Sequence, residues 1–409
     1  MTHKIRSYLM MSSNPHNNKS LWAIGWMSFF CSTATVMVFT LLPIFLTDVL
    51  GASKTKIGFI EGVSLFLAFV TKVFSGVLSD YWRSRKPIMM VGTFFSIVIK
   101  IMFALATSMT WIFAARSLDR IIKGIRTAPT DALIADLSQK NKEGSSYGIR
   151  YSLYMFGSVF GGIIAAGLMR VTDHNYRLIF WASIIPATLA FVILIFFVTP
   201  AVEPRQPAKK KDWNLADIKF LPPIFWQLLI VTFLLMMARF SESFLTLRAK
   251  DHGWSVAVLP LMMVAYELVH ASAALPIGKL ADRWNRHKLL LAGILVLAVT
   301  NCVILFSQTS MGILWGMILA GLHMGMTQGL ISALIAESTL PNLRGTAFAL
   351  YYLTCGTAVF IGNIVAGQLS DWCDGGAFWG GLVFALLSAA YLIFVLLSPE
   401  YKAKIISQS

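Results

Sequence analysis

The feature that most constrains this chain is a series of twelve apolar segments, each long enough to cross a membrane as a helix. A helix needs about 20 mostly apolar residues to cross the hydrocarbon core of a bilayer, which is about 30 Å thick. Of the 409 residues, 57% are hydrophobic and only 13% are charged, whereas soluble domains carry about 25% charged residues. The sequence therefore predicts an all-α membrane protein. The predicted spans are Leu21–Leu46, Ile57–Ser79, Ile88–Thr107, Trp111–Asp136, Ser146–Met169, Leu178–Val198, Ile224–Leu247, Val256–Leu280, Leu289–Ser307, Gly312–Glu337, Gly345–Leu369 and Phe378–Leu397.

The distribution of positive charge predicts the orientation of these spans. The first apolar segment is too long for the core of a signal peptide, so we expect a retained first helix. With the N-terminus in the cytoplasm, inner loops and tails hold about 19 Lys or Arg and outer loops about six. Both termini are therefore expected in the cytoplasm, with the chain in the cytoplasmic (inner) membrane. The same asymmetry accounts for the net charge of +15 without a nucleic-acid partner.

The chain divides into two halves that carry similar motifs in corresponding loops and helix ends. A stretch rich in proline and lysine, 199–223, is expected to be a cytoplasmic linker between six-helix halves at 21–198 and 224–397, with tails at 1–20 and 398–409. "SGVLSDYWRSRKP" follows the second span and "IGKLADRWNRHK" follows the eighth. "DALIAD" ends the fourth span and "SALIAE" ends the tenth. A repeat of six-helix units is typical of transporters that work by alternating access.

In these residues the chain resembles the major facilitator superfamily over essentially its whole length. The resemblance implies twelve helices in two halves related by a pseudo-two-fold axis, and a cytoplasmic gate formed by the two loops. Charge that only sets topology is the alternative explanation of the loops. In the first loop Tyr81 replaces the arginine that follows the aspartate in the family pattern. The gate candidates are Gly76, Asp80, Arg83, Gly278, Asp282 and Arg283.

The fourth span carries a stripe of charged and polar side chains. At 100° per residue, Arg116, Asp119, Arg120, Lys123, Arg126, Thr127, Thr130 and Asp131 fall within about 140° of the helix circumference. A single Arg, Lys or Asp at the centre of a lipid-facing helix costs roughly 2.5 to 3.5 kcal/mol, so the stripe must face protein or water.

Two explanations of the stripe remain open. One is an internal salt-bridge network, in which Asp119 neutralises Lys123. The other is an anion-binding surface, because cations outnumber acids on the stripe. The substrate-binding candidates on this reading are Lys72, Lys100, Arg116, Arg120, Lys123 and Arg126.

More narrowly, "DRIIKGIRTAPTDALIAD" is similar to the fourth helix of a bacterial subgroup of the superfamily, which reads Asp-Arg-x-x-Lys-Gly-x-Arg-x-Ala-Pro-Arg-Asp-Ala-Leu-Ile-Ala-Asp. Thr130 stands where that pattern has arginine, and Tyr154 stands where it commonly has aspartate. If these two positions normally pair, their joint replacement conserves the charge balance and allows a different substrate.

Several buried acids and a histidine are candidates for carrying a proton. A carboxylate or imidazole whose pKa lies near neutrality can bind and release a proton during transport. Fixed structural pairs are the alternative for each candidate, since Arg239 and Glu242, like Glu267 and His270, lie three residues apart. His323 is expected to be a hydrogen-bonded packing residue. The proton-coupling candidates are Glu61, Asp131, Glu242, Glu267 and His270.

Gly157, Gly161 and Gly162 in the fifth span predict close helix packing. They also resemble an antiporter motif of the superfamily, although the proline that usually follows its second glycine is absent. Export by antiport is therefore not indicated.

The remaining motifs narrow the function. The sequence contains no phosphate-binding P-loop and no nucleophile with a base and an orienting residue, so neither an ATP-driven pump nor an enzyme is expected. Cys31, Cys302, Cys355 and Cys373 lack metal-type spacing, and no metal or cofactor is expected. We expect a monomeric, proton-coupled secondary transporter that moves a small anionic solute, such as an organic carboxylate or a siderophore. Drug or metabolite efflux is the alternative. A receptor role would be favoured if the buried charges could be neutralised without loss of activity.

Overall fold

The computed structural model describes residues 15–81, 85–138, 143–199, 215–340 and 343–398, and every regular element in these ranges is a helix. The side chains of residues 15–17, 75–81, 143–145 and 215–217 lie outside this description. The helices are α2 (Pro15–Phe39), α3 (Leu42–Asp48), α4 (Lys54–Tyr81), α5 (Arg85–Ala104), α6 (Met109–Leu137), α7 (Glu143–Val171), α8 (Tyr176–Ala182), α9 (Ile184–Phe197), the 3₁₀ helix η1 (Leu215–Phe220), α10 (Pro223–Ala238), α11 (Glu242–Asp251), α12 (Leu259–Ala281), α13 (Arg286–Phe306), α14 (Ser310–Glu337), α15 (Arg344–Trp372) and α16 (Gly376–Leu397).

The predicted all-α membrane fold is confirmed. In the described part of the chain, 11 spans are long and apolar enough to cross a bilayer. The helix pairs α2 and α3, α8 and α9, and α10 and α11 each count as one such span. The remaining predicted span is α6, whose 29 residues extend about 43 Å at 1.5 Å per residue. It carries the stripe of charged side chains and is not among the 11 apolar spans.

Three spans that the sequence predicted as continuous helices are interrupted. Pro43 lies in the first turn of α3 and Pro186 in the first turn of α9, where a proline costs no backbone hydrogen bond. The third interruption separates α10 from α11 at residues 239–241 and involves no proline or glycine. A continuous helix over Ile224–Leu247 is therefore wrong.

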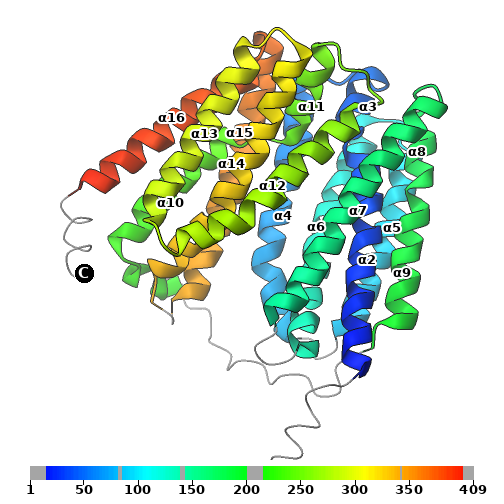
Figure 1. The fold of residues 1–409 in the computed structure, drawn as a ribbon, viewed down its shortest axis with the longest axis horizontal. Coiled ribbons are helices and arrows are strands. Elements are labelled where there is room, and N and C mark those ends of the chain that lie inside the picture. The colour runs from blue at the N-terminus through cyan, green and yellow to red at the C-terminus, as the bar shows by residue number, and fades with distance from the viewer. Residues whose placement is uncertain (1–14, 82–84, 139–142, 200–214, 341–342, 399–409) are drawn as a thin grey trace, which may run out of the picture. The chain divides into compact units, whose positions relative to one another are not determined.

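The described residues form two compact units, one of residues 15–39 and 74–199 and the other of residues 40–73 and 215–398. In the first unit α2 packs against α7 and α9, and α5 packs against α6 and α9. In the second unit α14 packs against α12 and α13, while α10 packs against α15 and α16 (Figure 1). Helix α4 belongs to the second unit as far as Val73, so the predicted boundary between linear halves stays a prediction.

Glycines permit close helix contacts at two places, between α2 and α7 and between α4 and α15. A Cβ atom on Gly157 of α7 would lie closer than 3.0 Å to the backbone of Phe29 in α2, and one on Gly161 would meet Thr33 in the same way. Helix α4 approaches α15 as closely, because a Cβ atom on Gly58 would meet the carbonyl oxygen of Asn363. The predicted close packing is confirmed for Gly157 and Gly161.

We predict that Gly157→Ala lowers the melting temperature of the detergent-purified protein, because the added methyl group meets backbone that cannot rotate away. Overpacking of this kind costs about 1 to 3 kcal/mol. Gly148→Ala, on the same helix, is the control, since no atom lies within 4 Å of its Cβ position. That variant should be neutral or more stable, because alanine favours a helix by about 1 kcal/mol over glycine. Equal melting temperatures for both variants would contradict the contact.

Candidate functional site

The inner part of the α6 stripe forms a buried network with α2 and α5. The Nζ atom of Lys100 lies 3.5 Å from Oδ1 of Asp119, and the Lys100 side chain is 0% exposed. The Arg116 guanidinium lies 3.9 Å from the centre of the Phe39 ring and is 4% exposed. Asp119 therefore pairs with Lys100 on the neighbouring helix and not with Lys123 as predicted. The ion pair with Asp119 matches the salt-bridge explanation for Lys100.

The remaining cations of the stripe are half-buried, and the contacts of Arg126 and Lys123 are with neutral groups. An N–H of Arg126 donates to the sulfur of Cys31 at 2.8 Å, and the Lys123 ammonium lies 5.9 Å from the centre of the Tyr154 ring. The Arg120 guanidinium lies 5.6 Å from the centre of the Phe39 ring. These three side chains remain partly accessible along one helix face.

The acid at the end of the stripe has an ion-pair partner. Asp131 pairs with Arg150 of α7. Asp131 thus has a partner of the kind that the alternative to proton transfer requires, and its side chain is 41% exposed.

Equivalent ion pairs lie at the ends of corresponding helices in the two repeats. Arg85 at the start of α5 pairs with Asp136 at the end of α6, and Arg286 at the start of α13 pairs with Glu337 at the end of α14. The Asp136 side chain is 3% exposed, whereas that of Glu337 is 54% exposed. In both matching segments, "DALIAD" and "SALIAE", the last acid therefore pairs with an arginine at the start of the preceding long helix.

The gate candidates are only partly described. Asp282 lies 3.3 Å from Arg286, and the residues Gly278, Asp282 and Arg283 are exposed where α12 ends. The exposure of Gly76, the side chain of Asp80 and the whole of Arg83 lie outside the described part of the chain. Their role in a gate stays a prediction.

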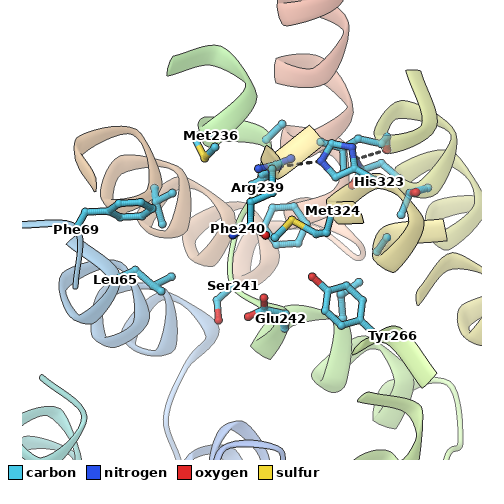
Figure 2. A pocket seen from close by; sticks show the side chains of 18 of the residues that line it. Leu65, Phe69, Met236, Arg239, Phe240, Ser241, Glu242, Tyr266, His323 and Met324 are labelled. Atoms are coloured by element: carbon cyan, nitrogen blue, oxygen red, sulfur yellow. Dashed lines mark hydrogen bonds between the residues drawn. The ribbon is translucent and has the colours of Figure 1, made fainter. Parts of the chain in front are cut away.

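A cavity of about 270 Å³ lies in the second unit, at the interruption between α10 and α11 (Figure 2). Its polar lining includes Arg239, Glu242, Tyr266 and His323, and its walls include many aromatic and aliphatic side chains. Lys72 of α4 also lines it, with its ammonium 5.0 Å from the centre of the Phe69 ring. Interrupted spans that line a cavity are typical of substrate sites in transporters.

The interruption is stabilised by a buried amide. The backbone N–H of Ser241 donates to Oδ1 of Asn363 at 2.8 Å, and Asn363 is 0% exposed. The Ser241 hydroxyl in turn accepts the N–H of Ser243 and caps α11. Backbone groups freed by the interruption thus find partners inside the protein. The available sequence signal was Ser241 followed by an acid, a pattern that often begins a helix.

Arg239 and His323 form a fixed polar contact across the cavity. The Arg239 Nε–H donates to Nε2 of His323 at 2.8 Å, and a second N–H donates to the Thr327 hydroxyl. Nδ1 of His323 lies 2.7 Å from the carbonyl oxygen of Gly293. Because a carbonyl only accepts, these partners assign the proton to Nδ1 and leave Nε2 as the acceptor of a neutral imidazole. His323 is thus the hydrogen-bonded packing residue that was predicted.

The acids of the second unit differ in their surroundings. Arg239 was expected to pair with Glu242, but Figure 2 shows Glu242 facing Tyr266. Glu267 and His270 form the predicted local pair at 3.4 Å. Glu61 on α4 is 2% exposed and does not line the cavity. Glu242 is therefore the acid among the five candidates that lines it.

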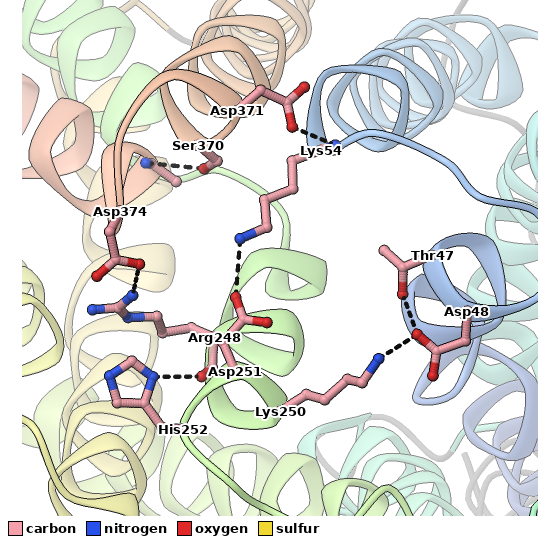
Figure 3. Close-up of polar contacts among 11 residues, drawn as sticks. Thr47, Asp48, Lys54, Arg248, Lys250, Asp251, His252, Ser370, Asp371 and Asp374 are labelled. Carbon is pink, nitrogen blue, oxygen red and sulfur yellow. Dashed lines mark hydrogen bonds and ion pairs between the residues drawn. The ribbon is translucent and has the colours of Figure 1, made fainter.

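A second polar cluster joins the start of α4 to the ends of α3, α11 and α15 (Figure 3). The Lys54 ammonium lies 2.9 Å from Asp251, and Lys250 pairs with Asp48. The Asp371 carboxylate accepts the backbone N–H of Lys54 at 2.9 Å and that of the following residue at 2.8 Å. Asp371 therefore caps α4 from a distant part of the sequence.

Arg248 extends this cluster to the loop between α15 and α16. Its side chain is 6% exposed and pairs with Asp374. The hydrogen bond from Arg248 holds the pKa of the Asp374 carboxyl below its usual value of 3.8. The carboxylate and its ion pair therefore persist at and above that pH, and their contribution is lost as the pH falls further.

Comparison with known proteins agrees with this architecture. The Major Facilitator Superfamily profile matches residues 24–249 and 228–408. The chain belongs to this superfamily. It is therefore a multi-pass membrane transporter and not an enzyme. No group of three or more His, Cys, Asp or Glu side chains that could hold a metal ion occurs in the described ranges.

Three proteins illustrate the range of relatives. An uncharacterised MFS-type transporter of Methanocaldococcus jannaschii is 26% identical over 97% of this chain and 100% of its own length. A multidrug resistance efflux pump PmrA homologue of Lactococcus lactis is 26% identical over 85% of this chain and 88% of its own. The crystal structure of the nucleoside transporter NupG has a TM-score of 0.73 at 14% identity, covering 91% of this chain and 97% of that one. The last likeness supports the fold alone.

We predict that Asp136→Asn destabilises the protein more than Glu337→Gln. Breaking a buried ion pair leaves an uncompensated charge and costs about 3 to 5 kcal/mol, whereas exposed pairs contribute less than about 1 kcal/mol. The melting temperatures of the two purified variants measure the difference. The double variant Arg85→Gln with Asp136→Asn should recover part of the loss. A larger effect at Glu337 would contradict the assignment.

Proposed function

We propose that this transporter moves a small anionic solute, such as an organic carboxylate or a siderophore, coupled to protons. It would act as a monomer in the cytoplasmic membrane with both termini in the cytoplasm. The observation that supports the anionic class is the set of half-buried cations on α6, namely Arg120, Lys123 and Arg126. Arg126 and Lys123 contact a sulfur and an aromatic ring, which do not neutralise their charge. Cations kept at membrane depth in this way favour an anionic ligand.

The proton would be carried by Glu242. Its carboxylate lines a cavity in an otherwise apolar span and lies beside the Tyr266 hydroxyl. Protonation removes its negative charge, and release restores it, so the two states of the cavity differ by one charge. A charge that changes during the cycle gives a proton gradient a means to bias the direction of transport.

Efflux of a drug or metabolite is the second candidate function. It is favoured by the similarity to the Lactococcus lactis efflux pump homologue and by the aromatic walls of the cavity. A lipophilic cation as substrate would leave the cations of α6 without a role in binding. The anionic class therefore accounts for more of the charged residues.

We predict that Lys123→Gln weakens binding of the anionic substrate at least tenfold. A hydrogen bond to a charged group contributes about 1.5 to 3 kcal/mol, and 1.4 kcal/mol corresponds to a factor of about ten. Thermal-shift titrations of the purified protein with citrate, succinate, benzoate and ferric citrate measure the affinity, with tetraphenylphosphonium as the cationic comparison. Lys56→Gln, which removes an exposed lysine of α4, is the control.

Two results would overturn the anionic class. One is an unchanged affinity in both Lys123→Gln and Arg120→Gln. The other is stabilisation by tetraphenylphosphonium alone, which would favour efflux of a lipophilic cation over transport of an anion.

We predict that Glu242→Gln abolishes substrate accumulation driven by an imposed pH gradient in liposomes but leaves exchange of labelled for unlabelled substrate. Glutamine cannot bind or release a proton, and exchange requires no net proton movement. Glu267→Gln, whose acid already pairs with His270, is the matched control and should keep both activities. If Glu242→Gln still accumulates substrate, the proton is carried elsewhere, with Glu61 and Asp131 as the next candidates.

A further inference from the structure

We propose that the cavity of the second unit is itself an anion-binding site, in which the Arg239 guanidinium binds the carboxylate of a solute with an aromatic or branched apolar body. His323 is the residue that positions this guanidinium. The proposal rests on the proposed transport of anions, and it adds a site whose residues are distinct from those of α6.

The first argument is the charge of Arg239. Its two hydrogen bonds go to a neutral imidazole and to the Thr327 hydroxyl, so neither supplies negative charge. The Thr327 hydroxyl donates its own proton to the carbonyl oxygen of His323 at 2.7 Å and therefore serves Arg239 as an acceptor. A guanidinium within an apolar span costs free energy unless an anion or water contacts it. A ligand carboxylate would replace the missing negative charge.

The second argument is the rigidity of the contact. His323 is 1% exposed, and its ring is held on one side by the Gly293 carbonyl of α13 and on the other by Arg239. A Cβ atom at Gly293 would meet the Thr327 methyl group, so α13 and α14 lie close together here. A guanidinium held by neighbouring helices is already oriented for a ligand, which reduces the entropy lost on binding.

The third argument is the rest of the cavity wall. Phe69, Phe240, Tyr266 and Tyr352 offer aromatic surfaces, while the volume of about 270 Å³ suits a small solute. Aromatic and aliphatic walls with a few oriented polar groups are typical of sites for small molecules. Lys72 adds a second cation to the lining, 5.8 Å from the centre of the Tyr352 ring, so that two cations face the one acid of the described lining, Glu242. Charge and shape together favour an aromatic or branched carboxylate over a sugar or a cation.

The decisive experiment compares benzoate, benzamide and benzylamine, which share a ring and differ in charge. Isothermal titration of the purified full chain should give tighter binding for benzoate than for the other two. In Arg239→Gln the Kd for benzoate should rise at least tenfold, while the weak binding of benzamide stays unchanged. Arg177→Gln is the matched control, because that arginine bonds the Ala106 carbonyl in the first unit and should leave both constants unchanged.

The positioning role of His323 needs its own variants. His323→Leu removes the acceptor and should weaken benzoate binding, whereas His323→Gln offers an amide oxygen to Arg239 and should restore part of the affinity. Equal losses in both variants would mean that His323 only packs the helices.

A labelling experiment covers the case in which Arg239→Gln does not fold. Gln328 lines the cavity and is exposed, so Gln328→Cys, with Cys302→Ser and Cys373→Ser, should react with a maleimide. Benzoate should slow that reaction and benzylamine should not.

Several outcomes would overturn the site. Benzoate affinity unchanged in Arg239→Gln, or labelling of Gln328→Cys unaffected by benzoate, would place no anion in this cavity. If Lys123→Gln loses anion binding and Arg239→Gln does not, the proposed anion transport is supported and the proposed site at Arg239 is contradicted. Binding of citrate but not benzoate leads to the same conclusion. If none of citrate, succinate and benzoate binds the natural chain, the proposed function fails as well.

Discussion

The cost of leaving a charge or a backbone amide without a partner in hydrocarbon governs this structure. Lys100 is 0% exposed and lies against Asp119, and Arg85 lies against Asp136 on the helix beside it. Each pair removes two charges from the lipid and joins two helices of the first unit, which apolar packing alone does less specifically. At the interruption of the seventh span the same constraint acts on the backbone, and the buried Asn363 amide accepts the N–H of Ser241, which has no partner within a helix.

The same constraint explains why the interruption and the cavity occur together. Non-helical backbone survives at membrane depth only where protein or water contacts it. Ending α10 at Ala238 and starting α11 at Glu242 places Arg239 on a short connection and Glu242 in the first turn of the next helix. Both side chains line the cavity. A regular helix through residues 239–241 would not place them there together. Structure and site thus depend on each other here.

The spans were predictable because apolar length is a property of the sequence alone, and so was the conclusion that the α6 stripe must face protein. The ion-pair and hydrogen-bond partners of the buried charges were not predictable, because the rule for residues three or four apart applies only within one helix. It suggested Lys123 for Asp119 and Glu242 for Arg239, whereas the partners lie on α5 and α14. The interruption of α10 and α11 lacks proline and glycine, and the cap that Asp371 provides for α4 joins residues far apart in sequence. Such features require the tertiary fold.

The partners also divide the buried cations into two classes with different chemistry. Lys100 and Arg85 contact carboxylates, so a ligand carboxylate would have to displace an existing ion pair at a cost similar to its gain. Arg126 contacts a thiol, Lys123 an aromatic ring, and Arg239 an imidazole and a hydroxyl. These neutral contacts hold the side chain in place without neutralising it. A ligand carboxylate can join such a cation and keep its hydrogen bonds, gaining the full charge interaction. The class of partner, more than the depth of burial, therefore separates cations that stabilise the fold from cations available to a substrate.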